Sequence, residues 1–252
     1  ARALIWTILG GYLLLPPVQA AFQPPGVPDL NKVTIPNIMA LVGALFLRGD
    51  RISFMLKGAT GKLLILLFVL SPFATVLGNT DPIVGPGHYI PGMRIYDSVS
   101  VVAQQAIALL PFFLARRYLG TPEAMLALAV ALASAGLLYS LPMLVEVRLS
   151  PQVNIWVYGF FQHDFGQTWR FGGYRPMVFL PHGLWLAFFM LMALVSAVLL
   201  VRVSGPGART RWAAAALWLA LMLLLCRSFG PYAYALVLVP LVLFARSRTQ
   251  IL

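Results

Sequence analysis

Charge is what this sequence has least of. Asp, Glu, Lys and Arg make up 10% of its 252 residues, whereas soluble domains carry about 25%. Hydrophobic residues make up 60%, and the mean hydropathy is +0.86. These values exclude an ordinary soluble globular protein. They predict an all-α fold, a polytopic bundle of membrane-spanning helices in contact with lipid.

Other absences exclude several kinds of chemistry. The single cysteine, Cys226, lies in an apolar run and excludes an intrachain disulfide, and no zinc-binding spacing is present. The sequence has no Walker motif, no GxGxxG after a strand, no HExxH and no DxD pair. We therefore expect no cofactor and no metal, neither a nucleotide-driven pump nor a metal-dependent transferase. Most of the cations behind the net charge of +11 occupy short loops between apolar runs, so we expect no nucleic-acid partner.

Eight apolar segments are present, and we predict one transmembrane domain, 1–252, with about eight spans. The second segment has 15 residues, fewer than the roughly 20 that cross a bilayer cleanly. The last two segments are joined by Cys226–Pro231 and should form a tight hairpin, while Gly78–Tyr96, rich in Pro and Gly, should be irregular. The segments are Leu4–Ala21, Val33–Leu47, Leu63–Leu77, Ser98–Ala115, Pro122–Leu141, Met177–Val201, Trp212–Leu225 and Tyr232–Ala245.

The distribution of Lys and Arg predicts the orientation. With a cytoplasmic N-terminus, twelve of the 18 cations fall in inner loops and six in outer loops, as the positive-inside rule requires. Five of the seven acidic residues also fall outside. The outer cations are Lys32, Arg94, Arg148, Arg170, Arg175 and Arg227.

The longest outer loop, Val145–Pro176, concentrates the chemistry of the chain. Arg170 and Arg175 flank Gly172–Gly173, and a guanidinium presents a planar fork of donors that matches phosphate oxygens. Arg227 lies on the same outer face, at the tip of the last hairpin, where an arginine near membrane depth indicates a function. For Arg170 and Arg175 the alternatives are contacts with lipid headgroups or ion pairs with Glu146 and Asp164. For Arg227 the alternative is snorkelling to the interface.

Two histidines near this loop are candidate catalytic residues. His163 would act as a general base only with a positioned partner, because adjacency to Asp164 does not make a dyad. His182 follows Pro181 at the start of an apolar helix, where a structural role is the alternative. The aromatic residues of the loop would stack on sugar rings or form an interfacial belt. They are Trp156, Tyr158, Phe160 and Phe161.

Two stretches resemble the bacterial O-antigen ligase and polymerase superfamily. The first runs from Arg170 to Gly183, reading RFGGYRPMVFLPHG, and leads into a long apolar helix. The second, Leu224–Ala233, reads LLCRSFGPYA and is similar to the Ser-Arg-Gly-containing helix start of that family. The resemblance covers roughly Arg170–Leu243. The sequence departs from the family at Pro181–His182, where Asn-Pro-Asn-like residues are common.

The resemblance implies a metal-independent, lipid-linked glycosyltransferase in the bacterial inner membrane. Its substrate would be an undecaprenyl-pyrophosphate-linked glycan on the periplasmic face, with Arg170, Arg175 and Arg227 facing the pyrophosphate. The large later loop that carries a histidine in this family is absent, and we expect residues before Ala1 and after Leu252. The alternative is a non-catalytic structural subunit that packs with other integral membrane subunits. A transporter is a third interpretation, but no paired broken helices are evident.

Overall fold

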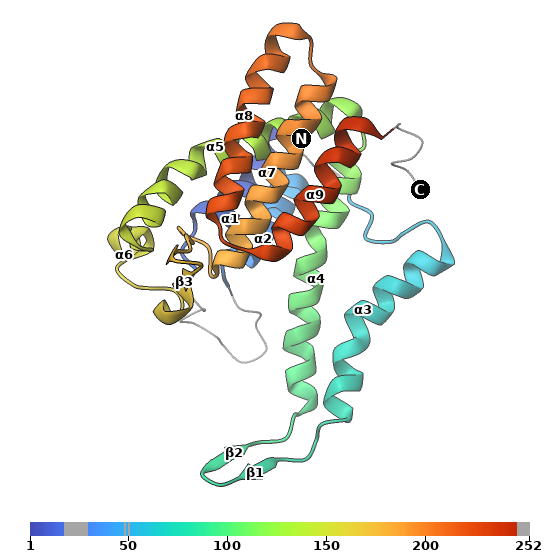
Figure 1. Ribbon diagram of the computed structural model, residues 1–252. Coiled ribbons are helices and arrows are strands. Elements are labelled where there is room, and N and C mark those ends of the chain that lie inside the picture. The colour runs from blue at the N-terminus through green and yellow to red at the C-terminus, as the bar shows by residue number, and fades with distance from the viewer. Residues whose placement is uncertain (18–29, 48, 50, 246–252) are drawn as a thin grey trace. The chain divides into compact units, whose positions relative to one another are not determined.

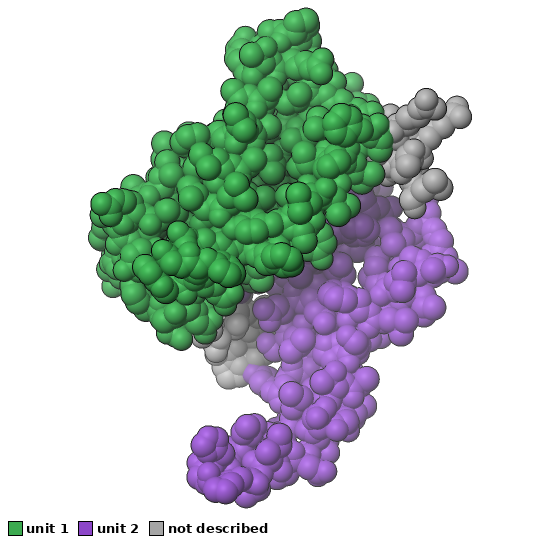
Figure 2. All heavy atoms as spheres, in the orientation of Figure 1, with its two compact units in different colours: residues 1–17, 121–252 green, residues 18–120 purple. Residues whose placement is uncertain are grey.

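The computed structural model describes residues 1–17, 30–47, 49 and 51–245. The chain divides into two compact units, Ala1–Pro17 with Thr121–Leu252, and Val18–Gly120 (Figure 2). The expectation of one transmembrane domain over 1–252 stays a prediction. The end of the first predicted segment, most of the Gln23–Lys32 loop, and the inner-loop cations Arg48, Arg246 and Arg248 lie outside the described residues.

Unit 1 is a helical bundle built around its most apolar helix, α7, Gly183–Val203 (Figure 1). Helices α5, α8 and α9 pack against α7, and α1 packs against α5. Large side chains such as Phe189 and Met190 of α7 are fully buried. The other elements of this unit are α1 Arg2–Leu14, α5 Pro122–Leu149, α6 Val153–Tyr158, the 3₁₀ helix η2 Phe165–Thr168, β3 Trp169–Arg170, β4 Gly173–Tyr174, α8 Pro206–Leu225 and α9 Phe229–Phe244.

Small residues allow α5, α7 and α8 to approach closely. A Cβ added at Gly136 of α5 would lie 2.5 Å from Cβ of Ala193 on α7 and 3.1 Å from a methyl carbon of Leu219 on α8. Ala129 and Ala133 precede Gly136 on the same face and are also buried. In a membrane, where apolar burial gives little drive between helices, such small-residue contacts favour association through close packing.

Helix α5 is longer than the sequence pattern predicts. It begins where expected, because Thr121 Oγ1 accepts a hydrogen bond from the Ala124 amide and Pro122 occupies the first turn. It then continues through Pro142 to Leu149, past the predicted end at Leu141. Val145–Leu149 therefore belong to the helix, and the non-helical part of the loop begins at Ser150, whose φ is 91°.

Unit 2 contains a helical part and a two-stranded hairpin. The segment predicted to be irregular, Gly78–Tyr96, includes antiparallel strands paired from Ile83–Ile90 to Gly85–His88. Gly87 takes the positive φ of 75° in the connecting turn. The elements are α2 Thr34–Val42, the π-helix η1 Gly43–Leu47, α3 Ala59–Leu77, β1 Ile83–Gly85, β2 His88–Ile90 and α4 Ile95–Tyr118.

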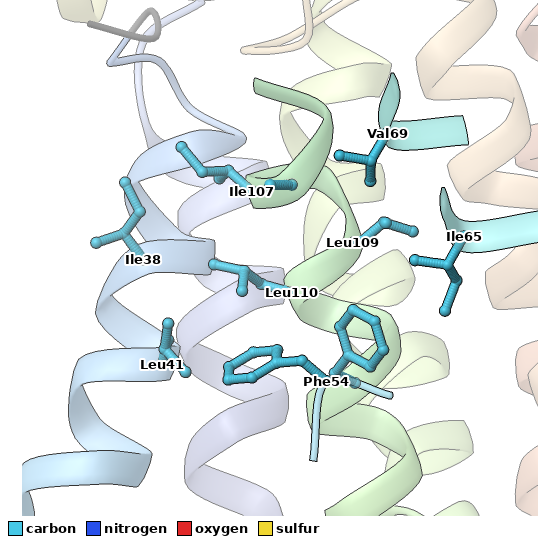
Figure 3. Close-up of a pocket in the computed structure, with 10 residues that line it drawn as sticks. Ile38, Leu41, Phe54, Ile65, Val69, Ile107, Leu109 and Leu110 are labelled. Atoms are coloured by element: carbon cyan, nitrogen blue, oxygen red, sulfur yellow. The ribbon is translucent and has the colours of Figure 1, made fainter. Parts of the chain in front are cut away.

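Helix α4 packs against α2 and α3 through one face. Leu109 and Leu110 of α4 meet Ile38 of α2 and Ile65 of α3 around an apolar pocket of about 440 Å³ (Figure 3). Phe113 is buried at the same pocket and meets Phe54 edge to face, with ring centroids 5.5 Å apart. This contact fixes which side of α4 remains exposed.

Five helices in the described part of the chain are long and apolar enough to cross a membrane: α3, α4, α5, α7 and α8. The all-α, membrane-protein expectation is confirmed, but the count of eight spans is not supported. The other predicted segments form shorter apolar helices, Arg2–Leu14, Thr34–Leu47 and Phe229–Phe244. Proline explains the first of these, because Pro16 and Pro17 follow α1 directly and disfavour helical geometry in the residue before them.

Candidate functional site

Glu146 fixes both ends of the predicted outer loop from inside unit 1. Its side chain, on α5, is fully buried. One carboxylate oxygen accepts the Val153 amide at 3.1 Å, and the other accepts the Met177 and Val178 amides at 2.7 Å each. Such bonds compensate the cost of burying a carboxylate. Glu146 therefore anchors backbone rather than pairing with the arginines.

The segment between Thr168 and Arg175 forms a tight hairpin. Strands β3 and β4 pair Trp169 with Tyr174 and Arg170 with Gly173. The turn residues Phe171 and Gly172 have φ values of 49° and 71°, and positive φ at both central positions is typical of a type I′ hairpin turn. The Arg175 amide donates to the Thr168 carbonyl at 2.7 Å, which closes the hairpin.

Arg227 holds this hairpin against the turn between α8 and α9. Arg227 has a positive φ of 51°. Its Nη1 donates to the Arg170 carbonyl at 2.9 Å and also to the Phe171 carbonyl. A Cβ at Gly173 would collide with the Arg227 guanidinium where it lies, so glycine allows this close approach. The arginine expected to face a ligand therefore acts first on the protein backbone.

Arg175 is the most deeply buried member of the group, with 3% of its surface exposed. Its Nη2 donates to Ser228 Oγ at 2.7 Å, and Ser228 in turn donates to the Cys226 carbonyl at 3.1 Å. Its Nε is buried and has no hydrogen-bond partner among the described residues. Burial lowers the pKa of Arg175, and the positive charge of Arg170 lowers it further.

His182 and His163 lie beside these arginines. His182 Nδ1 accepts the Leu184 amide at 2.9 Å and so caps α7. Burial lowers the pKa of His182, and the charges of Arg175, His163 and Arg170 lower it further. The two imidazole rings meet edge to face, with centroids 4.6 Å apart. The structure thus brings together both predicted histidines and all three predicted arginines.

The carboxylate next to His163 is used elsewhere. Asp164 Oδ1 accepts the Gly166 amide at 2.9 Å and caps η2. His163 Nε2 instead lies 3.3 Å from Gln167 Oε1. Among the residues that the structure describes, neither Asp164 nor Glu146 forms an ion pair with the arginines, and no group of three metal-binding side chains is found. The positive charges of this site therefore lack an acidic counterpart within the described chain.

Two polar side chains that the sequence pattern does not single out lie in the same outer loop. Gln162 donates to the Val178 carbonyl at 2.9 Å and the Leu180 carbonyl at 3.2 Å, and fully buried Asn154 donates to the Phe160 carbonyl at 2.7 Å. The side-chain oxygens of both are buried without a partner among the described residues. The carboxamides of Asn154 and Gln162 are noticeable in a mostly apolar chain, but the sequence does not show which groups they bond.

The aromatic residues of the loop divide between structural and exposed roles. The Tyr158 hydroxyl donates to the Leu14 carbonyl of α1, and its ring meets Phe179 edge to face at 5.2 Å. Trp156 is 60% exposed and is free to contact lipid headgroups or a ligand. Phe161 packs edge to face on Phe165, with ring centroids 5.5 Å apart.

The long apolar helices define the class of this molecule. It is a helical multi-pass membrane protein whose apolar helices contact lipid. Comparisons of the chain with models of known protein families, with curated proteins and with solved structures find no match.

Proposed function

We propose that the protein binds the pyrophosphate of a lipid-linked glycan at the arginine cluster, defined as Arg170, Arg175 and Arg227. The glycan would be carried on undecaprenyl pyrophosphate and transferred as in the O-antigen ligases and polymerases that Arg170–Gly183 and Leu224–Ala233 resemble. The site would lie on the periplasmic face of the bacterial inner membrane, with the N-terminus in the cytoplasm.

The unpartnered Nε of Arg175 carries this proposal. The guanidinium is buried, its other end is fixed on Ser228, and no carboxylate pairs with it among the described residues. A buried donor without an acceptor costs about 1–3 kcal/mol, more when the group is charged. An anion that accepts from Nε would remove this cost and balance the local positive charge.

The other residues take distinct parts in the proposed site. Arg170 is exposed beside Arg175, and its side chain has no hydrogen bond within the described structure, so its donor fork is free for a second phosphate. His182 accepts the Leu184 amide through Nδ1, so the neutral ring carries its proton on Nε2 and serves as a donor. Arg227 positions the Arg170 backbone and is a positioning residue.

His163 is the candidate base in this proposal. Glycan transfer requires removal of a proton from the acceptor hydroxyl, and His182 is unsuited because its Nδ1 is occupied and its Nε2 is protonated. Besides its ring contact with His182, the only hydrogen-bond contact of the His163 imidazole among the described residues is the long one between Nε2 and Gln167, and either ring nitrogen can hold the proton. His163→Gln should therefore abolish transfer while leaving pyrophosphate binding intact.

The binding step is tested with the full chain in lipid nanodiscs and farnesyl pyrophosphate as the probe. Arg175→Lys and Arg170→Lys should each weaken binding about 10- to 100-fold, because one charge-assisted hydrogen bond is worth about 1.5–3 kcal/mol. Arg148→Lys is the matched control, since Arg148 is an exposed arginine at the end of α5. Farnesol, which lacks phosphate, should not compete. Equal affinities for the wild type and both cluster variants would refute the proposal.

A structural subunit is the second candidate, and one observation favours it. The hydrogen bonds of Arg227 go to backbone carbonyls of its own chain, as expected if Arg227 only stabilises the fold. Most of the surface of α3 and α4 is exposed and apolar, which suits helices that pack on other membrane subunits. Absence of farnesyl pyrophosphate binding, together with a stable co-purifying membrane complex, would favour this function.

The orientation is tested separately by cysteine labelling. With the N-terminus in the cytoplasm, Gln152→Cys should react with a membrane-impermeant reagent from the periplasmic side, and Thr210→Cys from the cytoplasmic side. Reaction of Gln152→Cys from the cytoplasm alone would reverse the proposed orientation.

A further inference from the structure

A polar side chain lies in the middle of a membrane-spanning helix on its exposed side. Helix α4 runs from Ile95 to Tyr118, and Gln104 lies about 14 Å along it at 1.5 Å per residue. The hydrocarbon core of a bilayer is about 30 Å thick, so Gln104 lies near the bilayer midplane. Gln104 is exposed, and its amide has no hydrogen-bond partner within the described residues.

The exposed face of α4 follows a regular spacing. Val101, Gln104 and Ala108 are exposed at intervals of three and four residues, the spacing of a helix–helix seam. At 100° per residue this stripe is opposite Leu110 and Phe113, which are buried in the contact with α2 and α3 (Figure 3). The stripe is therefore not part of the packing that holds unit 2 together.

An amide in hydrocarbon needs a hydrogen-bond partner at the same depth. Lipid tails supply neither donors nor acceptors, so an unpaired amide costs free energy there. Copies of one chain inserted in the same orientation place Gln104 at one depth, and their helices meet parallel to each other. A carboxamide has both a donor and an acceptor and so pairs with an identical group in both directions.

We propose that α4 associates with α4 of a second copy of this chain, with the two Gln104 side chains exchanging hydrogen bonds near the bilayer midplane. The contact is two-fold symmetric, as in most homodimers. Ala108 lies one turn from Gln104 and allows the two helix backbones to approach closely. Val101 supplies the apolar contact on the other side of the glutamine. This inference is independent of the proposed pyrophosphate site.

Cross-linking tests the geometry of the dimer. The full chain is reconstituted in lipid vesicles in a Cys226→Ala background, which removes the natural cysteine. Gln104→Cys and Ala108→Cys should form disulfide-linked dimers on oxidation, whereas Ile107→Cys, which lines the pocket between α2, α3 and α4, should not. Absence of an intermolecular disulfide at both stripe positions would overturn the inference. The same result is expected if another part of the same chain covers Gln104, so that case is refuting as well.

Energy transfer between labelled copies tests the role of the amide. Interhelical hydrogen bonds in membranes average about 0.6 kcal/mol each, so losing a reciprocal pair should weaken dimerisation roughly eightfold, at 1.4 kcal/mol per tenfold change. Gln104→Leu should show this loss. Val102→Leu, on the same helix but about 130° away from the centre of the stripe at 100° per residue, should change the association less than twofold. Equal effects of the two substitutions, or a monomeric wild type, would refute the proposal.

Discussion

Removing the Arg227 side chain should loosen the β3–β4 hairpin, since this guanidinium joins it to the turn between α8 and α9. In Arg227→Ala the carbonyls of Arg170 and Phe171 lose their donor. Both of these residues are exposed, so water can replace the donor, and the net loss should be about 0.5–1.5 kcal/mol per bond. Together the two bonds give about 1–3 kcal/mol. Arg227→Lys should give an intermediate loss because an ammonium lacks the planar fork.

Hydrogen exchange reports this loss locally. The Arg175 amide, bonded to Thr168, should exchange roughly 5- to 150-fold faster in Arg227→Ala, because each 1.4 kcal/mol is a factor of ten. Arg148→Ala serves as the control, since Arg148 is exposed and lies outside the hairpin. Exchange within twofold of the wild type in Arg227→Ala would show that the hairpin is stable without Arg227 and would refute this prediction.

A double-mutant cycle isolates the contact between Arg227 and Gly173. Gly173→Ala should weaken the attachment of the hairpin in the wild type, because the new methyl group forces the Arg227 guanidinium to shift away from its carbonyl partners. Gly173 does not have a positive φ, so alanine brings no backbone strain of its own. In an Arg227→Ala background the same substitution should be nearly neutral. A coupling energy near zero in this cycle would place the cost of Gly173→Ala elsewhere.

Two further predictions concern buried groups near the cluster. Glu146→Gln should destabilise unit 1 by at least about 1–3 kcal/mol, because the new NH₂ group faces one or two backbone amides that now lack an acceptor. Chemical unfolding in detergent measures this loss. Unchanged stability would contradict the anchoring role of Glu146. Because the pKa of His182 is lowered on folding, the unfolded chain binds a proton first as the pH falls below about 6.5. The melting temperature should therefore drop more steeply below that pH in the wild type than in His182→Asn, which retains a helix cap without titrating; parallel curves would contradict the assignment.

Apolar runs predict the helices of this protein well because a membrane helix satisfies its backbone internally and needs little else. Their ends are harder to predict, and Pro142 shows why. The predicted helix stopped just before Pro142, but α5 continues through it to Leu149. Proline is tolerated within membrane helices where neighbouring groups satisfy the freed carbonyl. Composition gives no sign of such compensation.

The sequence predicts which residues form the candidate site, but not which hydrogen bonds they make. Arg170, Arg175 and Arg227 stand out because cations are rare in this sequence. An ion pair with Glu146 was one of the alternatives for Arg170 and Arg175, since opposite charges attract. Glu146 accepts backbone amides as far away as Val178 instead, because the return of the chain to α7 brings those donors to it. Such a contact depends on the loop path, which local pattern does not specify.

The three arginines use their donors in different ways. Arg227 directs Nη1 at two carbonyls of its own chain, and Arg175 has one end fixed on Ser228 and the other, Nε, open. The Arg170 side chain makes no hydrogen bond within the described residues. In the proposed site a bound pyrophosphate would contact Arg170 and Arg175 directly, and the two Nη1 bonds of Arg227 would act on it through the hairpin. Substitutions at Arg170 should change affinity without changing stability, and substitutions at Arg227 should change stability first.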